Sequence, residues 1–191
     1  MKRQLLVALL ALIFADAAFA ADYTIDARHT QVLFTYTHMG FSHITGRLNE
    51  ASGHFDFDPA APAKSSIEVD IPLSSLSTGV TGLDDHMRSA DFFDVGKFPS
   101  AHFKSTKVTS TDKNHLSVAG DLTIHGVTKP VVLQVAINQI GVHPMKKVPA
   151  VGLDASATIK RSDFGVGNFI PTGSDEVALR ITLEAQQTKA N

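Results

Sequence analysis

Apolar and polar residues alternate along most of this chain, which is the pattern of β-strands with one buried face. The clearest case is the stretch 67–73, where Ile, Val, Ile and Leu are separated by Glu, Asp and Pro. Successive side chains of a strand point to opposite faces, so each such stretch buries one side. The pattern predicts about eight strands, which contain residues 32–36, 54–57, 67–73, 103, 116–124, 131–137, 151–159 and 177–185.

Turn-forming residues separate these strands, and no helical stretch recurs between them. Asp58-Pro59 begins one turn, residues 110–114 form a hairpin loop, and residues 125–130 form a second hairpin. The stretch 141–149, with two prolines, is a longer connection. Strands that follow one another without crossover helices predict an all-β, antiparallel sandwich or closed barrel. Periodicity alone does not distinguish the two.

The alternation stops at residues 83–99. A charged turn over residues 84–88 favours a short helix, because its aspartates lie in the first turn and its arginine in the last. Phe92 and Phe93 follow, and two adjacent aromatic side chains are costly to leave in water. The segment is therefore a lid over one end of the sheet, or a lid that is also the wall of a ligand cavity.

The first twenty residues have the features of a secretory signal peptide. Lys2 and Arg3 precede an apolar run over residues 5–14, and residues 18–20 give an A-x-A cleavage site. We expect cleavage after Ala20, followed by a single domain over residues 22–189.

Composition excludes several other classes of protein. The chain has no cysteine, which excludes disulfides, thiolate metal sites and cysteine nucleophiles. Its formal charge of −2 gives no electrostatic basis for binding nucleic acid. An exported domain without disulfides depends on core burial and suits a bacterial periplasm. Its 12 phenylalanines form either a solid core or the lining of a cavity, because a barrel of about eight strands is wide enough for one small ligand.

Candidate catalytic and metal-ligating residues are plentiful but poorly patterned. His29, His38 and His43 lie close in sequence, yet their spacing matches no metal signature. No G-x-S-x-G nucleophile elbow is present, and residues 165–167 lack the remaining glycine of a dinucleotide site. Asp163, two residues after Arg161, predicts a local salt bridge or cap. We therefore expect no catalytic residue, no metal and no cofactor.

Two alternatives stay open at this point. One is a small metal- or haem-associated periplasmic protein, or a hydrolase, that uses the loop histidines. The other is a stress-response module that binds a protein partner and holds no ligand.

Six motifs occur in a fixed order along nearly the whole chain after residue 20. They are HTQVLF, THMGFS, SSLSTG, DHMRSADFFDVGKFP, GDLTIHGVTKP and RSDFG, at residues 29–34, 37–42, 74–79, 85–99, 120–130 and 161–165. In this order and spacing they resemble the YceI-like, polyisoprenoid-binding family. Met87 and Phe98 depart from the leucine and tyrosine usual in that family, and both keep the site apolar.

The resemblance implies a lipocalin-like antiparallel barrel with one or two short helices and an elongated apolar cavity. It implies a periplasmic binding protein for an isoprenoid or related long-chain amphiphile, such as a quinone, with no defining enzymatic activity. Some relatives lie beside or are fused to membrane b-type cytochromes, so a cytochrome of this kind and a homodimer are candidate partners.

The predicted ligand site combines aromatic and apolar residues with a few polar residues in loops. A register shift of one residue would turn any strand's contribution outward. The predicted wall residues are Phe34, Tyr36, Phe41, Phe55, Phe57, Leu76, Met87, Phe92, Phe93, Phe103, Phe164 and Phe169. The predicted polar residues at the cavity mouth are His38, Arg88 and Arg161.

Overall fold

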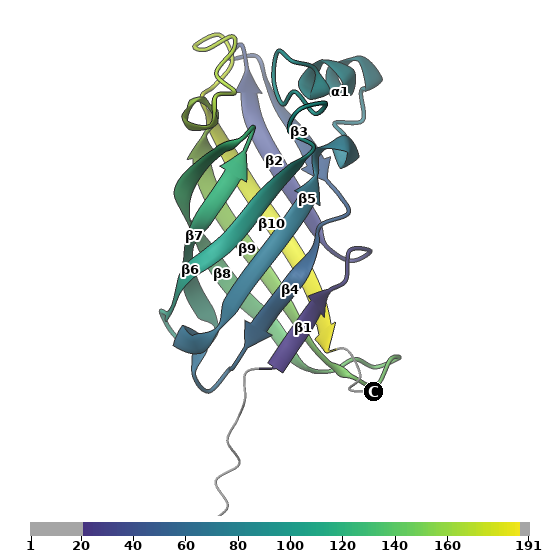
Figure 1. Ribbon diagram of the computed structural model, residues 1–191, viewed down its shortest axis with the longest axis vertical. Helices are drawn as coiled ribbons and strands as arrows, with labels where there is room; N and C mark the ends of the chain where they lie inside the picture. The colour runs from purple at the N-terminus through teal and green to yellow at the C-terminus, as the bar shows by residue number, and fades with distance from the viewer. Residues whose placement is uncertain (1–20, 188–191) are drawn as a thin grey trace, which may run out of the picture.

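The computed structural model describes residues 21–187, which form one antiparallel sheet of ten strands with a short helix at one end (Figure 1). The expected signal peptide, its cleavage after Ala20 and the last two residues of the predicted domain lie outside these described residues. The elements are β1 (Ala21–Ile25), β2 (Gln31–His38), β3 (Ser42–Leu48), β4 (Ser52–Phe57), η1 (Pro62–Lys64), β5 (Ser66–Pro72), η2 (Leu73–Ser75), α1 (Thr81–Arg88), β6 (Ser100–Ser110), β7 (His115–Ile124), β8 (Val127–Val142), β9 (Pro149–Lys160), η3 (Arg161–Phe164) and β10 (Glu176–Gln187).

The sheet closes on itself because β1 has neighbours on both sides. Its residues 21–24 pair with β4, and its residues 23–25 pair with the last residues of β10. A ring of eight strands results, in the order β1, β4, β5, β6, β7, β8, β9 and β10. The predicted all-β antiparallel barrel is thereby confirmed, and the sandwich alternative is wrong.

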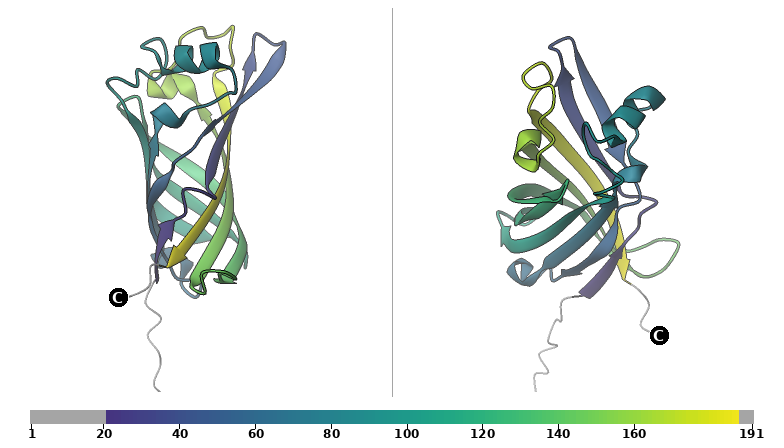
Figure 2. Two further views of the ribbon diagram at one scale, coloured as in Figure 1. Left: turned by 90° about the vertical axis from the view of Figure 1, so that its right-hand side faces the viewer. Right: turned by 45° about the horizontal axis from the view of Figure 1, so that its top comes forward.

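The hairpin β2–β3 widens one end of this ring. β10 pairs with β1 near its C-terminal end, whereas its residues 178–182 pair with β2. β3 then pairs with β2 and meets the chain before α1 through a bridge between Arg47 and Ser77. Figure 2 shows this hairpin splaying outward at the end that also carries α1 and the loop before β10.

The strands confirm the predicted alternation, with two differences. β1 and β3 were not predicted, and the short apolar alternation of β3, at Ile44 and Leu48, is interrupted by Gly46 opposite Phe34. The predicted loop 125–130 is a two-residue turn, His125-Gly126, since residues 128–130 already pair with β7. Both turn residues have positive φ, as tight hairpin turns require.

The core fills the barrel and continues under α1. The larger cluster joins residues from most strands, and a smaller one consists of Phe34, Leu76 and Met87 beneath the helix. α1 begins at Thr81 and ends at Arg88, which confirms the short helix predicted in the charged segment. Within residues 21–187, no helix has both the length and the apolar character needed to cross a bilayer.

Candidate ligand-binding cavity

The barrel interior contains two adjoining cavities. The lower cavity, of ≈ 160 Å³, lies among the barrel strands, and the upper cavity, of ≈ 540 Å³, lies beneath α1. They share four lining residues, Leu48, Ala101, Ile124 and Leu179, so the two cavities lie next to each other along the barrel. The upper cavity alone falls within the range of about 300–1,000 Å³ that is usual for ligand pockets.

The lower cavity is lined almost entirely by hydrocarbon. Phe55 and Phe57 of β4 and Phe103 of β6 face it, together with valines, leucines and isoleucines of the other strands. Its polar lining residues are limited to Thr30, Ser65 and Ser66. A lining of this kind suits an alkyl or prenyl chain and offers nothing to a charged group.

Two segments far apart in sequence form the roof of the upper cavity. One is α1 with the connection to β6, and it contributes Met87, Phe92 and Phe93. The other is the loop before β10, which contributes Phe169. The predicted Phe92 and Phe93 thus lie half-buried between the cavity and the surface, so the charged segment is both lid and cavity wall.

The two roof segments meet through a small set of contacts. The rings of Phe92 and Phe169 lie 5.8 Å apart, and His86 packs edge-on against both rings, at 5.1 Å and 6.0 Å. The Asn168 side-chain amide donates a hydrogen bond of 2.6 Å to the carbonyl of Asp91. Separating the two segments therefore requires breaking one hydrogen bond and the two ring contacts of Phe169.

Arg161 organises the loop before β10. Its guanidinium donates to the carbonyls of Val166 and Asn168, both at 2.7 Å, and its Nε donates to the carbonyl of Ser174 at 2.8 Å. Burial lowers the pKa of Arg161, while Asp175 and Tyr36 act in the opposite direction. Arg161 lines the upper cavity, but most of its donors are already bonded to the loop.

The expected local salt bridge between Arg161 and Asp163 does not form. Among residues 21–187, the acidic group that acts on Arg161 is Asp175, and the Asp175 carboxylate accepts hydrogen bonds from the backbone and hydroxyl of Ser162. Asp163 lies next to Ser162 in η3 and takes no part. Asp163 is closer than Asp175 to Arg161 in the sequence. In the structure, however, the Arg161 side chain points toward the backbone carbonyls of the loop before β10.

β2 contributes two further polar groups to the upper cavity. Tyr36 and His38 both line it, and burial raises the pKa of Tyr36 while Arg161 acts to lower it. The loop before β10 is tied to this strand at Thr37, whose carbonyl accepts a hydrogen bond from the Ser174 amide and whose amide donates to the Ser174 hydroxyl. A bridge between His38 and Gly173 adds to this connection. The polar groups therefore gather at the wide end of the cavity.

Twelve of the fifteen predicted site residues line one of the cavities. In the upper cavity these are Phe34, Tyr36, His38, Met87, Phe92, Phe93, Arg161, Phe164 and Phe169, and in the lower cavity Phe55, Phe57 and Phe103. The structure thus brings into the barrel interior six residues from strands and six from α1, η3 and the connecting loops.

Three predicted residues lie elsewhere. Phe41 is 92% exposed, because it lies at the tip of the hairpin, between the Met39-Gly40 turn and the first residue of β3. Leu76 is buried against Phe34 and Met87, behind the cavity wall. Arg88 donates to the Leu76 carbonyl and to Asp85, and its buried Nε has no hydrogen-bond partner in the described part of the chain.

Sequence reasoning missed several cavity residues. Val177 and Leu179 could have been found, because they belong to the same alternating face of β10 as other predicted core residues. Met39, His86 and Asn168 carry no such signal, since each sits in a turn, a helix or a loop whose direction the sequence does not reveal.

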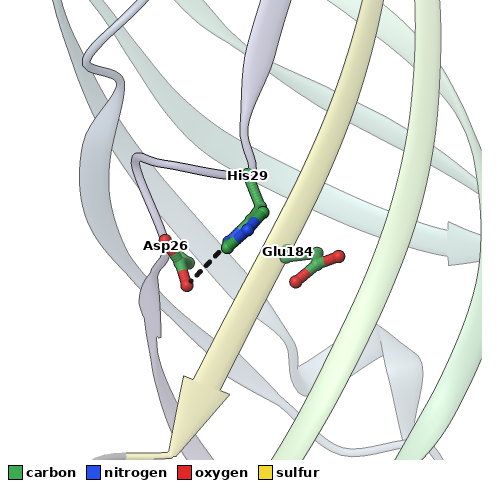
Figure 3. Close-up of side chains that lie close together, drawn as sticks. All are labelled: Asp26, His29 and Glu184. Carbon is green, nitrogen blue, oxygen red and sulfur yellow. Dashed lines mark ion pairs between the residues drawn. The ribbon is translucent and has the colours of Figure 1, made fainter. Parts of the chain in front are cut away.

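The loop histidines do not gather into a metal site. Among residues 21–187, the one group of three possible ligands with atoms within 4.8 Å of one another is Asp26, His29 and Glu184, which Figure 3 shows close together. The Asp26 carboxylate already receives His29 at 3.2 Å and the Lys146 ammonium at 3.3 Å. Lysine thus supplies the positive charge of this cluster, while His38 and His43 belong to no such group.

Comparison with known proteins agrees with this architecture. A model of the YceI-like domain matches residues 23–185. A UPF0312 protein of Pseudomonas syringae pv. tomato is 42% identical over 181 residues, which cover 94% of this chain and 93% of the relative. A UPF0312 protein of Enterobacter sp. strain 638 is 40% identical over 194 residues and covers 100% of both chains.

Solved structures show the same fold. BcnA of Burkholderia cenocepacia superposes with a TM-score of 0.76 at 27% identity and covers 84% of this chain and 98% of its own. The YceI protein of Campylobacter jejuni gives 0.70 at 29% identity, with coverage of 80% and 90%. A polyisoprenoid binding domain of Saccharophagus degradans gives 0.69 at 17% identity, with coverage of 88% and 99%. This chain belongs to the YceI-like family.

Proposed function

We propose that this protein binds a long-chain isoprenoid or a related amphiphilic lipid inside its barrel and acts without catalysis, as a carrier or scavenger. The observation that carries the proposal is the pair of adjoining, mostly apolar cavities inside the barrel. The polyisoprenoid binding domain of Saccharophagus degradans shares this fold, which supports the same class of ligand here.

The arrangement of polar groups suggests how such a ligand lies. Tyr36, His38 and Arg161 all face the upper cavity, whereas the lower cavity is hydrocarbon. Burial of an apolar tail is favourable and burial of an unpaired polar group is not. The tail therefore points down the barrel, and the head group stays beneath the roof.

Burial of the tail alone supplies enough free energy. A prenyl unit has about five carbons, and each buried methylene-sized group contributes about 0.8 kcal/mol. Three or four units contribute about 12–16 kcal/mol before ordering costs, whereas micromolar affinity requires about 8 kcal/mol. No strong interaction with the head group is needed.

The place of action follows from the expected signal peptide. An exported protein of this kind would take up or deliver lipid in the bacterial periplasm. A membrane b-type cytochrome and a second copy of the chain are the partners we propose for it, on the family resemblance alone.

Native mass spectrometry of the exported protein tests the proposal. We expect a co-purifying lipid with wild type and at least about 30-fold weaker retention after Phe92→Asp with Phe93→Asp, because a carboxylate in an apolar wall costs about 2 kcal/mol or more. Val132→Asp with Ile140→Asp is the matched control, since both residues lie exposed on β8. Stoichiometric zinc or haem without lipid, or full retention by the folded double variant, would overturn the proposal.

A further inference from the structure

Apolar side chains continue from the upper cavity to the outer surface. Met39 and Phe169 line the cavity and are also 51% and 58% exposed. Phe41, at 92% exposure, lies two residues beyond Met39 on the same hairpin tip. Exposed apolar side chains do not stabilise a protein surface in water, and where they are grouped they mark an interaction site.

The backbone at two of these positions favours other residues. Met39 has φ 52° and Phe169 has φ 65°, in the left-handed region that glycine and asparagine occupy with least strain. At the hairpin tip, Met39 and Gly40 form a two-residue turn closed by a 3.0 Å hydrogen bond from Phe41 N to the carbonyl of His38. Asn-Gly is the favoured pair for such a turn. Local conformation therefore does not account for an apolar side chain at either position.

The hairpin carries no negative charge. Residues 38–48 contain no carboxylate; they include Arg47, toward the end of β3, and the exposed imidazoles of His38 and His43. α1 and the connection after it carry several aspartates. The hairpin side of the mouth is therefore the side that an anionic surface would attract.

We propose that the hairpin tip, residues 38–43, together with Phe169 docks this protein on an anionic phospholipid bilayer, with the cavity mouth facing the membrane. Apolar side chains flanked by basic groups are typical of segments that lie in the bilayer interface. The inference rests on the proposed function in that a docked mouth allows a lipid to pass between bilayer and cavity without crossing water.

Vesicle co-sedimentation tests the docking surface directly. The probe is a vesicle of phosphatidylethanolamine and phosphatidylglycerol, and the test variant is Met39→Asn with Phe41→Ser. Asparagine suits the positive φ of position 39, so the turn is kept while both apolar groups are lost. We expect binding at least about tenfold weaker than wild type.

The control variant carries similar changes at the other end of the barrel. Ile140→Asn with Val142→Ser alters two exposed apolar residues where β8 leads into β9, away from α1 (Figure 1). We expect wild-type vesicle binding from this variant. Equal loss in both double variants, or full binding by Met39→Asn with Phe41→Ser, overturns the proposal.

A fluorescent reporter distinguishes a membrane from a protein partner. The chain has no tryptophan, so Phe41→Trp introduces a single indole at the hairpin tip. We expect its emission to shift to the blue when vesicles are added, and the emission of Val142→Trp to stay unchanged. An unshifted emission from the Phe41→Trp variant, or a vesicle-independent dimer in sedimentation that Phe41→Ser abolishes, overturns docking on a bilayer.

Native mass spectrometry of the same samples keeps the two proposals separate. A protein that retains lipid but binds no vesicles contradicts the docking surface alone. A protein that binds vesicles through the hairpin tip but never holds a lipid supports the docking surface and contradicts the proposed carrier.

Discussion

Gly46 lets an aromatic ring pack directly against the backbone in the upper half of the barrel. It pairs with Phe34 across β2 and β3, and a Cβ at this glycine would lie 2.2 Å from the Phe34 ring. The ring therefore covers the backbone of β3, where any side chain would push it away. Phe34 in turn packs against Leu76 and Met87 and lines the upper cavity, so one glycine controls the shape of that cavity.

Gly46→Ala tests this contact. We expect the free energy of unfolding to fall by about 1–3 kcal/mol, because the Phe34 ring must leave its position in a packed core. Gly82→Ala in α1 is the control: nothing lies within 4 Å of its Cβ position, and alanine favours a helix over glycine by up to about 1 kcal/mol. Chemical denaturation measures both. Equal stability of Gly46→Ala and wild type would show that the ring moves freely.

At the scale of elements, strands with a continuous apolar face were predictable and the connections were not. Phe55, Phe57 and Phe103 all face inward as their alternation indicates. β3 escaped prediction because Gly46 stands in the middle of its inward face, between Ile44 and Leu48, and a glycine gives no apolar signal. Phe41 was misplaced because it lies at a hairpin tip, where the alternation of the strands gives no direction for a side chain.

The partners of charged residues in loops also could not be predicted from the sequence. Arg161 bonds to carbonyls of residues 5 to 13 positions away, and a carbonyl leaves no mark in the sequence. The nearby Asp163 therefore looked like its partner. The alternation of apolar and polar residues likewise could not predict that the sheet closes, since closure depends on β1 pairing with β10 from the other end of the chain.

The helix α1 depends on one buried carboxylate. Asp84 Oδ1 accepts hydrogen bonds from the backbone N and the hydroxyl of Thr78, both at 2.6 Å. The Thr78 hydroxyl is the main cause that lowers the pKa of Asp84, and burial opposes it. Asp84 thus joins the helix to the chain that leads up to it, beneath the cavity roof.

Asp84→Asn should cost about 1–2 kcal/mol at neutral pH, because an amide oxygen accepts these bonds more weakly than a carboxylate. A carboxyl whose folded pKa is lowered adds stability above its unfolded pKa and loses it as pH falls through the folded pKa. The difference from wild type should therefore shrink below about pH 4. Thermal unfolding at several pH values measures it.

Asp85→Asn is the control for this change, since Asp85 is exposed and pairs with Arg88 at 3.3 Å. Exposed pairs contribute about 0–1 kcal/mol. An Asp85→Asn variant that lost as much stability as Asp84→Asn would contradict the role assigned to the bonds with Thr78.

At the scale of the whole molecule, the ring is least extensively paired where it closes. We call the pairing of β1 with β10 the closing seam: it spans residues 23–25 of β1, whereas β9 and β10 pair over residues 176–186 of β10. Asp26 follows the seam directly. Its carboxylate accepts hydrogen bonds from Gln186 of β10 at 3.2 Å and from Lys146 of the β8–β9 connection at 3.3 Å. One side chain therefore joins three parts of the chain at the seam.

The charge of Asp26 makes the seam sensitive to acid. Burial acts to raise the pKa of Asp26, but hydrogen bonds from His29, the Arg28 amide and Lys146 lower it further than burial raises it. Because the folded pKa is lowered, the stability that Asp26 contributes is present above the unfolded pKa, about 3.9, and is lost as pH falls through the folded pKa. Acid should therefore loosen the closing seam.

Hydrogen exchange of the β1 amides measures that loosening. We expect the protection factors of residues 23–25 to fall below about pH 4, and Asp26→Asn to show part of that fall, roughly tenfold, already at neutral pH. Asp112→Asn is the matched control, because its carboxyl pKa is also lowered but it lies in the exposed β6–β7 turn. If Asp112→Asn altered β1 protection as much as Asp26→Asn, the effect would be one of net charge. If neither did, backbone pairing alone would hold the barrel closed.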